Sequence, residues 1–160
     1  MTHTIFAVVD NKPGVVSRVS GLFTRRGYNI ESLVTGVTDD PMIYKLTVVL
    51  NGTEEKKDLL VAQLQRIQEV ISVSVAEHTP CALSEMMLLA VPAHTEEDRA
   101  QARAFAESLG LRLCLEADAV LVFELCDTPE ALDTARSAMR ARFPGAYSVR
   151  SGAIGLALDP

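Results

Sequence analysis

Residues 10–14, with the sequence DNKPG, place polar side chains, a proline and a glycine directly before a predicted helix. The first N–H groups of a helix lack intrahelical acceptors and carry partial positive charge, so an anion can bind there. Gly14 has no Cβ and would let a ligand approach the backbone. Asn11 offers both a hydrogen-bond donor and an acceptor. The segment therefore indicates a site for a small anionic ligand.

A free amino acid suits this segment better than a nucleotide. Asn11 could serve a carboxylate and an ammonium group together, and Asp10 could add charge for the ammonium. Val15 and Val16 would meet a small aliphatic side chain. The glycine-rich nucleotide loops G-x-G-x-x-G and G-x-x-x-x-G-K are absent. The same residues are also common in turns and helix caps, and on spacing alone that explanation is the more frequent one.

The elements that must position this loop follow from apolar periodicity. Helices are expected to start behind the caps Thr53, Thr95 and Thr128, and one is expected to end at Gly27. In the first half the predicted elements are a strand at Thr2–Asp10, a helix at about 14–26, strands at Asn29–Thr38 and Met42–Leu50, a helix after Thr53, and a strand at Val70–Glu77. This βαββαβ order is that of a ferredoxin-like domain.

The second half repeats the order. Its predicted elements are a strand at Met86–Val91, a helix at Glu96–Leu109, strands at Leu111–Glu116 and Val120–Leu125, a helix at Pro129–Arg142, and a strand at Tyr147–Leu158 interrupted by SGAIG. The predicted fold class is therefore α+β, with two tandem ferredoxin-like βαββαβ domains at 1–78 and 86–160. Residues 79–85 contain Pro80 and lack periodicity, which predicts a linker.

Composition excludes several classes of partner. The chain has 15 Lys and Arg residues against 21 Asp and Glu, a net charge of −6, and no basic tract. An acidic surface repels phosphate backbones, so no nucleic-acid partner is expected. No apolar run reaches the about 18 residues needed to span a bilayer, and the N-terminal residues lack the pattern of a signal peptide. We expect no membrane partner.

Cysteines and histidines give no sign of a metal site or a catalytic site. Cys81, Cys114 and Cys126 lack C-x-x-C spacing and are predicted to be reduced, buried thiols. The histidines are scattered, and about four ligands are needed for structural zinc. No local nucleophile and base pair is present either. The sequence predicts a cytoplasmic protein with no metal and no catalytic residue.

One long segment carries a family resemblance. DNKPGVVSRVSGLFTRRGYNIESLVTGVTDDP closely resembles the N-terminal ACT domain of the regulatory small subunits of acetohydroxyacid synthase, also called acetolactate synthase. The family pattern is N-x-x-G-x-L/V-x-R-V-x-G-L-F-x-x-R-G-[YF]-N-I-E-S-L followed by a T-x-D-P turn. The match covers residues 3–50 well and residues 51–78 in a general way. The closing VRSGAIGLALD is similar to the family's last segment, while the rest of the second half matches less well.

The resemblance implies an ACT domain at 1–78 that dimerises side by side and binds a branched-chain amino acid, usually valine, between two copies. Asn11 and Gly14 fall on effector-contact positions of the loop, and Asn29 falls on a contact position from the facing protomer. The effector-binding residues implied by the resemblance are Asn11, Gly14, Val15, Val16, Asn29 and Ile30.

The resemblance also implies a homodimer that binds a separate catalytic large subunit, activates it and makes it sensitive to feedback. Thiamine diphosphate, Mg²⁺ and FAD are expected in that partner, with no cofactor in this chain. Two alternatives come from other classes: a free-standing ACT module that senses amino acids for a different partner, and a small enzyme on a ferredoxin-like scaffold. The lack of a convergent acid, base or nucleophile set weighs against the enzyme.

Overall fold

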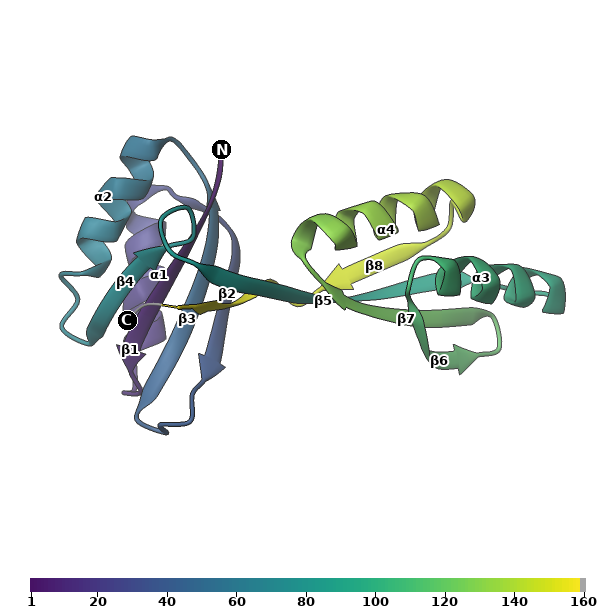
Figure 1. The fold of residues 1–160 in the computed structure, drawn as a ribbon, viewed down its shortest axis with the longest axis horizontal. Helices are drawn as coiled ribbons and strands as arrows, with labels where there is room; N and C mark the ends of the chain where they lie inside the picture. The colour runs from purple at the N-terminus through teal and green to yellow at the C-terminus, as the bar shows by residue number, and fades with distance from the viewer. Residues whose placement is uncertain (159–160) are drawn as a thin grey trace. The chain divides into compact units, whose positions relative to one another are not determined.

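The computed structural model describes residues 1–158, without the side chains of Arg25 and Arg26. The chain forms two compact units (Figure 1). The first unit contains Met1–Leu83 together with the chain from Ala153 onward, and the second contains Ser84–Gly152. The sequence-based division at 78 and 86 therefore differs from this one mainly at the C-terminal end, where the last residues return to the first unit.

The first unit has the order β1, α1, β2, β3, α2, β4. The elements are β1 Thr2–Asp10, α1 Val15–Arg26, β2 Asn29–Val37, β3 Ile43–Asn51, α2 Glu54–Leu64 and β4 Val70–Val75. The four strands form an antiparallel sheet in the order β2-β3-β1-β4. Helices α1 and α2 lie on the same face of this sheet (Figure 1). This arrangement confirms the predicted ferredoxin-like fold, and each element lies within a few residues of its expected bounds.

The core of the first unit lies between the sheet and its two helices. Alternate residues of β1 point to this side, and Ile5, Ala7 and Val9 are all at most 1% exposed. They pack with Val15, Val19, Leu22 and Phe23, which recur along one stripe of α1. The same packing fixes the end of β1 and the start of α1, and so it fixes the loop between them.

The second unit repeats this connectivity. Its elements are β5 Cys81–Pro92, α3 Glu96–Ser108, β6 Arg112–Ala117, β7 Val120–Asp127, α4 Pro129–Arg142 and β8 Tyr147–Arg150. The strand order is β6-β7-β5-β8. Its separate core includes Met87, Leu89, Phe123 and Leu132. The second βαββαβ prediction is thus confirmed as well.

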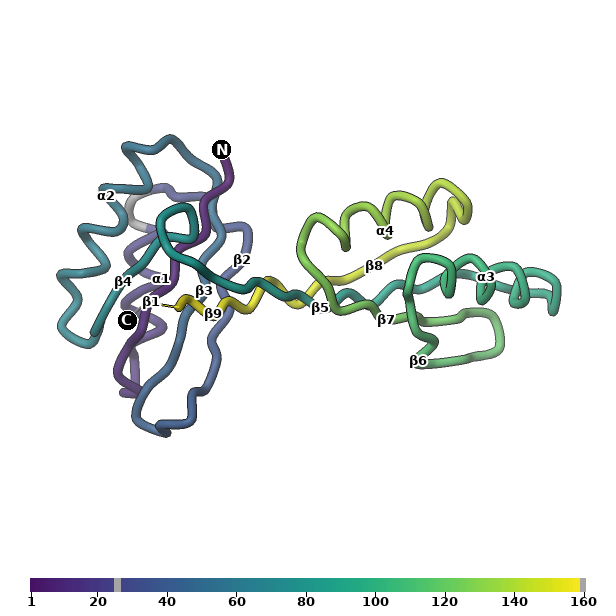
Figure 2. Tube along the Cα trace, viewed as in Figure 1, coloured from purple at the N-terminus to yellow at the C-terminus, as the bar shows by residue number. Residues whose placement is uncertain are grey.

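Two details of the second half differ from prediction. Strand β5 begins at Cys81, so much of the segment expected as a linker is extended strand that runs across the boundary between the units. The last predicted strand is two strands: β8 ends at Arg150, and a separate β9, Ile154–Ala157, pairs with β5. Figure 2 traces β9, in yellow, alongside the strands of the first unit.

The cysteine prediction was wrong on burial. Cys114 and Cys126 are exposed and Cys81 is partly exposed, although all three are free thiols. Both exposed cysteines lie on strands, β6 and β7, whose side chains alternate between core and solvent, and they fall on the solvent side. Within residues 1–158, no helix has the length and apolar character required to cross a membrane.

Candidate functional site

Asn11 joins the loop after β1 to the turn between β2 and β3. Its backbone N–H donates to the carbonyl of Met42 at 2.7 Å, and its side-chain Nδ2 donates to the carbonyl of Pro41 at 2.8 Å. The side-chain donor is therefore already used to hold the turn. The oxygen Oδ1 remains as the acceptor that the side chain can offer, since no donor to it occurs among the residues the structure describes.

Sequence reasoning missed the turn as part of this region. From sequence, the TDDP segment, residues 38–41, is expected only as a turn between two strands. In the structure Asp40 fixes it, since Oδ1 of Asp40 accepts from the N–H of Met42 at 2.8 Å. The signal was present in the strand order: β1 pairs with β3, and Asp10 is the partner of Ile43, so the residues that follow Asp10 must meet the residues that precede Ile43.

Gly14 caps α1 in a left-handed conformation, with φ of 87° and ψ of −4°. An L residue rarely adopts this conformation, so glycine is favoured here by the backbone. Space is not the reason, because an added Cβ would meet nothing within 4 Å. The backbone of Gly14 is therefore unobstructed on its Cβ side, and a ligand can approach it from there.

The first turn of α1 has unsatisfied N–H groups. Gly14 supplies no side-chain cap, and the first turn contains no acidic residue. Among the described residues, the N–H groups of Val16 and Ser17 find no hydrogen-bond acceptor, while that of Val15 donates to the carbonyl of Lys12 at 3.3 Å. These N–H donors and the positive end of the helix dipole can together bind a carboxylate.

Asp10 is paired within the loop. Its Oδ2 lies 2.6 Å from Nζ of Lys12. The hydrogen bond from Lys12 to this carboxylate raises the pKa of the Lys12 ammonium above its usual range. Asp10 would therefore have to be shared between Lys12 and an arriving ammonium group, which weakens the role suggested for it from sequence.

Val15 and Val16 have different environments. Val15 is 2% exposed and belongs to the core cluster beneath the sheet. Val16 is 37% exposed on the surface of α1. Only Val16 of this pair offers its side chain to a molecule at the loop, and Val15 contributes packing that holds the helix start in place.

Asn29 and Ile30 lie at the opposite end of the sheet from this loop. Asp10 pairs with Ile43, whereas Asn29 pairs with Asn51. At about 3.4 Å per residue, the eight residue steps from Ile43 to Asn51 along β3 span about 27 Å. Asn29 is exposed, and Ile30 is half-buried against the core. A single chain therefore does not bring Asn29 to the loop at Asn11–Gly14.

The position of β2 indicates how Asn29 of one copy could come close to the loop at Asn11–Gly14 of another copy. β2 is an edge strand of the sheet, with its outer backbone groups unpaired by β3. If a second copy continued the sheet antiparallel through β2, the Asn29 end of one copy would lie beside the Val37 end of the other. Val37 pairs with Tyr44, next to Ile43, so it is at the same end of the sheet as the loop.

Two family models match the chain, one in each half. A model described as "AHAS small subunit-like ACT domain" matches residues 5–72. A model described as "Small subunit of acetolactate synthase" matches residues 84–159. All six candidate residues lie within the first match.

Two relatives match over most of their own length. The chain is 32% identical over 132 residues to "Probable acetolactate synthase small subunit" of Methanothermobacter thermautotrophicus, which covers 82% of this chain and 79% of the relative. It is 29% identical over 156 residues to "Acetolactate synthase isozyme 3 small subunit" of Salmonella typhimurium, covering 98% and 95%. Among solved structures, the acetolactate synthase small subunit from Thermotoga maritima superposes with a TM-score of 0.82 at 21% identity, over 100% of this chain and 99% of that one. The last comparison shows a shared fold.

Proposed function

The chain belongs to the acetolactate synthase small-subunit family, and from this premise we propose that it is a non-catalytic regulatory subunit controlled by a branched-chain amino acid. It would bind a catalytic large subunit, raise its activity and confer inhibition by valine or a related amino acid. The relatives' names, which describe small subunits of one enzyme, support such a partner.

The observation that carries the effector site is the open N-terminus of α1 at Gly14. Free N–H groups, the positive end of the helix dipole and an unobstructed Cβ side of a glycine occur together there. The carboxylate of the effector would accept from these N–H groups. The exposed Val16 would contact its aliphatic side chain, and Oδ1 of Asn11 is the acceptor for its ammonium group.

The second half of the site would come from another copy of the chain. Because Asn29 lies about 27 Å along the sheet from the loop of its own chain, it can contribute only to the loop of a partner. Antiparallel pairing of two β2 edges gives a twofold dimer with two equivalent sites. Each site would then contain Asn11 and Gly14 of one chain and Asn29 of the other.

Regulation would follow from linkage between this site and the partner enzyme. An effector held by two copies favours the arrangement of the dimer that binds it best. The activity of the catalytic subunit would follow that equilibrium, with a coupling of about 1–3 kcal/mol typical of allosteric effects. Thiamine diphosphate, Mg²⁺ and FAD would belong to the catalytic subunit, and this chain would hold none of them.

The first experiment is to assay purified catalytic subunit with and without this chain, and then to titrate valine. We expect activation by the chain and loss of that activation as valine rises. Activation without a response to valine, leucine or isoleucine would contradict the proposed effector site but support the proposed binding to the catalytic subunit. A catalytic subunit that neither binds nor responds to the chain would overturn the proposed function as a whole.

A further inference from the structure

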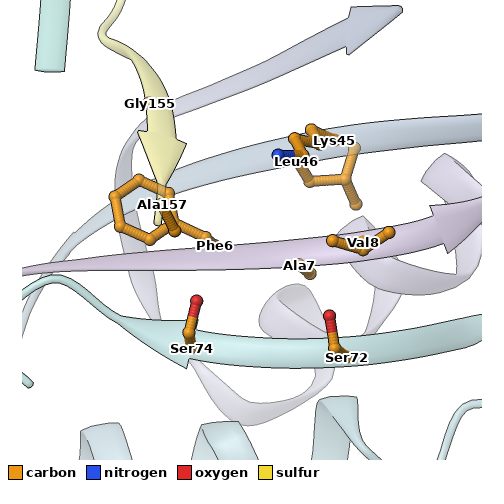
Figure 3. A pocket seen from close by; sticks show the side chains of 9 residues that line it. All are labelled: Phe6, Ala7, Val8, Lys45, Leu46, Ser72, Ser74, Gly155 and Ala157. Carbon is orange, nitrogen blue, oxygen red and sulfur yellow. The ribbon is translucent and has the colours of Figure 1, made fainter. Parts of the chain in front are cut away.

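The first sheet has a face that its helices do not cover. Ile5, Ala7 and Val9 point to the helices, so Phe6 and Val8 of β1 point to the opposite face. Phe6 is nevertheless only 6% exposed. The residues that cover it belong to the C-terminal segment, residues 153–158, which contains β9 (Figure 3).

Small residues allow the C-terminal segment to lie close to Phe6. A Cβ added to Gly155 would overlap with the Phe6 ring, and would stand 2.9 Å from its Cδ1. Ala157 is the next residue on the same side of β9 and also lines the cavity of about 180 Å³ beside the ring. In Figure 3 the Phe6 ring lies next to Ala157 and below Gly155, and Ser74 and Ser72 belong to the neighbouring strand β4. The fit depends on glycine at position 155.

Hydrogen bonds hold the segment in place as well. The N–H of Gly155 donates to Oγ1 of Thr47 at 3.0 Å, and both groups are buried. The N–H of Leu158 donates to the carbonyl of Pro80 at 2.8 Å. Ala153, at the start of the segment, is 3% exposed. A loosely associated tail would not bury a polar pair and a glycine contact together.

The chain just before the segment is also fixed. Gly152 is the last residue of the second unit, and its N–H donates to Oε1 of Glu85 at 3.0 Å. The other carboxylate oxygen of Glu85, which is only 7% exposed, is paired with Arg150. Arg150 in turn donates to Asp133 of α4 at 2.9 Å. A displacement of residue 153 would therefore disturb the ion pair of Glu85 and Arg150 and, through Asp133, helix α4.

We infer that the C-terminal segment transmits the effector state of the first unit to the second unit. Phe6 and the candidate loop belong to one stretch of chain, since Phe6 lies four residues before Asp10 on β1. A change in β1 on effector binding would alter the contact with Gly155, and the segment would carry it to Gly152 and Glu85. Contiguous packed and hydrogen-bonded contacts of this kind can carry coupling between sites. The inference rests on the proposed function for its effector.

Gly155→Ala tests the segment, and Gly52→Ala is the matched control. Both substitutions add one Cβ, but the Cβ at Gly52 would meet its nearest atoms at 3.6 Å, an ordinary contact. Thr47→Val is a second variant, which keeps the shape and removes the acceptor of Gly155. Unchanged far-ultraviolet circular dichroism and unchanged amide protection in α1 and α2 would show that each variant still folds.

Hydrogen exchange without any effector gives the first readout. In Gly155→Ala and Thr47→Val, amides of residues 153–158 should exchange about tenfold faster or more, because the docked state is destabilised. The amide of Gly152 and those of the first turns of α4 should also exchange faster, while Gly52→Ala should match the unaltered chain. Faster exchange confined to residues 153–158 would overturn the inference whether or not the chain responds to valine.

The second readout uses the complex with the catalytic subunit. On its own, Gly155→Ala should bind valine with a Kd within about twofold of the unaltered chain, yet in the complex it should lose most of the valine-dependent inhibition, as expected when coupling is removed and the site is kept. Full inhibition in this variant would overturn the inference and leave the proposed function intact. No valine response in the unaltered chain would instead count against the effector site, and the exchange experiment would then decide on the segment alone.

Discussion

The two units of the chain place a helix after their first strand in the same position, but they begin that helix in opposite ways. In the first unit, Gly14 caps α1 without a side chain, and no acidic residue lies in the first turn. In the second unit, Thr95 and Asp98 form a reciprocal capping box at α3, and Glu96 and Glu97 stand beside it. One helix N-terminus is left open to an anion, and the other is closed by its own residues.

The shared fold therefore does not determine where a ligand can bind. Both units have the βαββαβ order and the same strand arrangement. The difference resides in the residues before each helix and in its first turn, which either satisfy the helix donors or leave them available. We therefore expect the candidate site to be confined to the first unit.

Gly14→Asp should have the largest effect. The added carboxylate would face the bound carboxylate of the effector, and like charges in contact cost about 3 kcal/mol, or more than about 100-fold in Kd. Gly14→Asn is the matched control, because asparagine tolerates the left-handed backbone as aspartate does but carries no charge. Calorimetric titration of valine into each variant measures the difference. Equal affinities for the two variants would place the effector carboxylate elsewhere.

Asn29→Ala should weaken effector binding without a comparable loss of stability. Removing one hydrogen bond to a charged group is expected to raise the Kd for valine about tenfold. Asn29 is exposed at the end of an edge strand, so the free energy of unfolding should change by less than about 0.5 kcal/mol. Chemical denaturation and valine titration on the same sample compare the loss of stability with the loss of affinity. If the free energies of unfolding and of valine binding fall by equal amounts, Asn29 serves the turn only.

Thr95→Ala should affect stability and leave the effector response unchanged. It removes the side-chain cap of α3, which accepts from the N–H of Asp98 at 3.1 Å, and caps of this kind contribute about 1 kcal/mol. The unfolding midpoint in urea should fall accordingly, while the Kd for valine stays the same. A change in valine affinity would show that the second unit takes part in the site.

The pH dependence of stability should show the same contrast, with the smallest effect. Hydrogen bonds from Thr95 lower the pKa of Asp98 below its ordinary value of 3.8. A carboxyl group with a lowered pKa in the folded state stabilises fully above its unfolded pKa, and this contribution disappears as pH falls through the folded pKa. In the unaltered chain stability should therefore decline below about pH 3.8 more steeply than in Asp98→Asn. Parallel declines in acid denaturation curves would contradict this assignment.

Much of the fold follows from local sequence patterns. The threonine caps at 53, 95 and 128 each accept the backbone N–H that the pattern predicts, and α1 ends at Gly27 as expected. Caps and apolar periodicity act over a few residues, so they can be inferred from one chain without long-range contacts.

The candidate site was less predictable from sequence, because some of its residues pack in the core or hold a turn while others are exposed to a ligand. Val15 has helical spacing with Val19 and Phe23 and packs with them in the core, although it was assigned to the ligand. The bond from Asn11 to Pro41 and the docking of Gly155 on Phe6 join residues 30 and about 150 positions apart in the chain. Such contacts depend on strand order and on which face of a sheet is free.

The opposite placement of Asn29 and the loop has a consequence for solutions that contain two kinds of chain. If each site needs a loop from one copy and Asn29 from the other, the number of sites follows the number of dimers, and dilution removes sites as it removes dimers. A dimer of one Gly14→Asp chain and one Asn29→Ala chain would have one site with both substitutions and one site with neither. Mixing these two weakly binding variants should therefore restore full valine affinity at about half of the mixed dimers' sites.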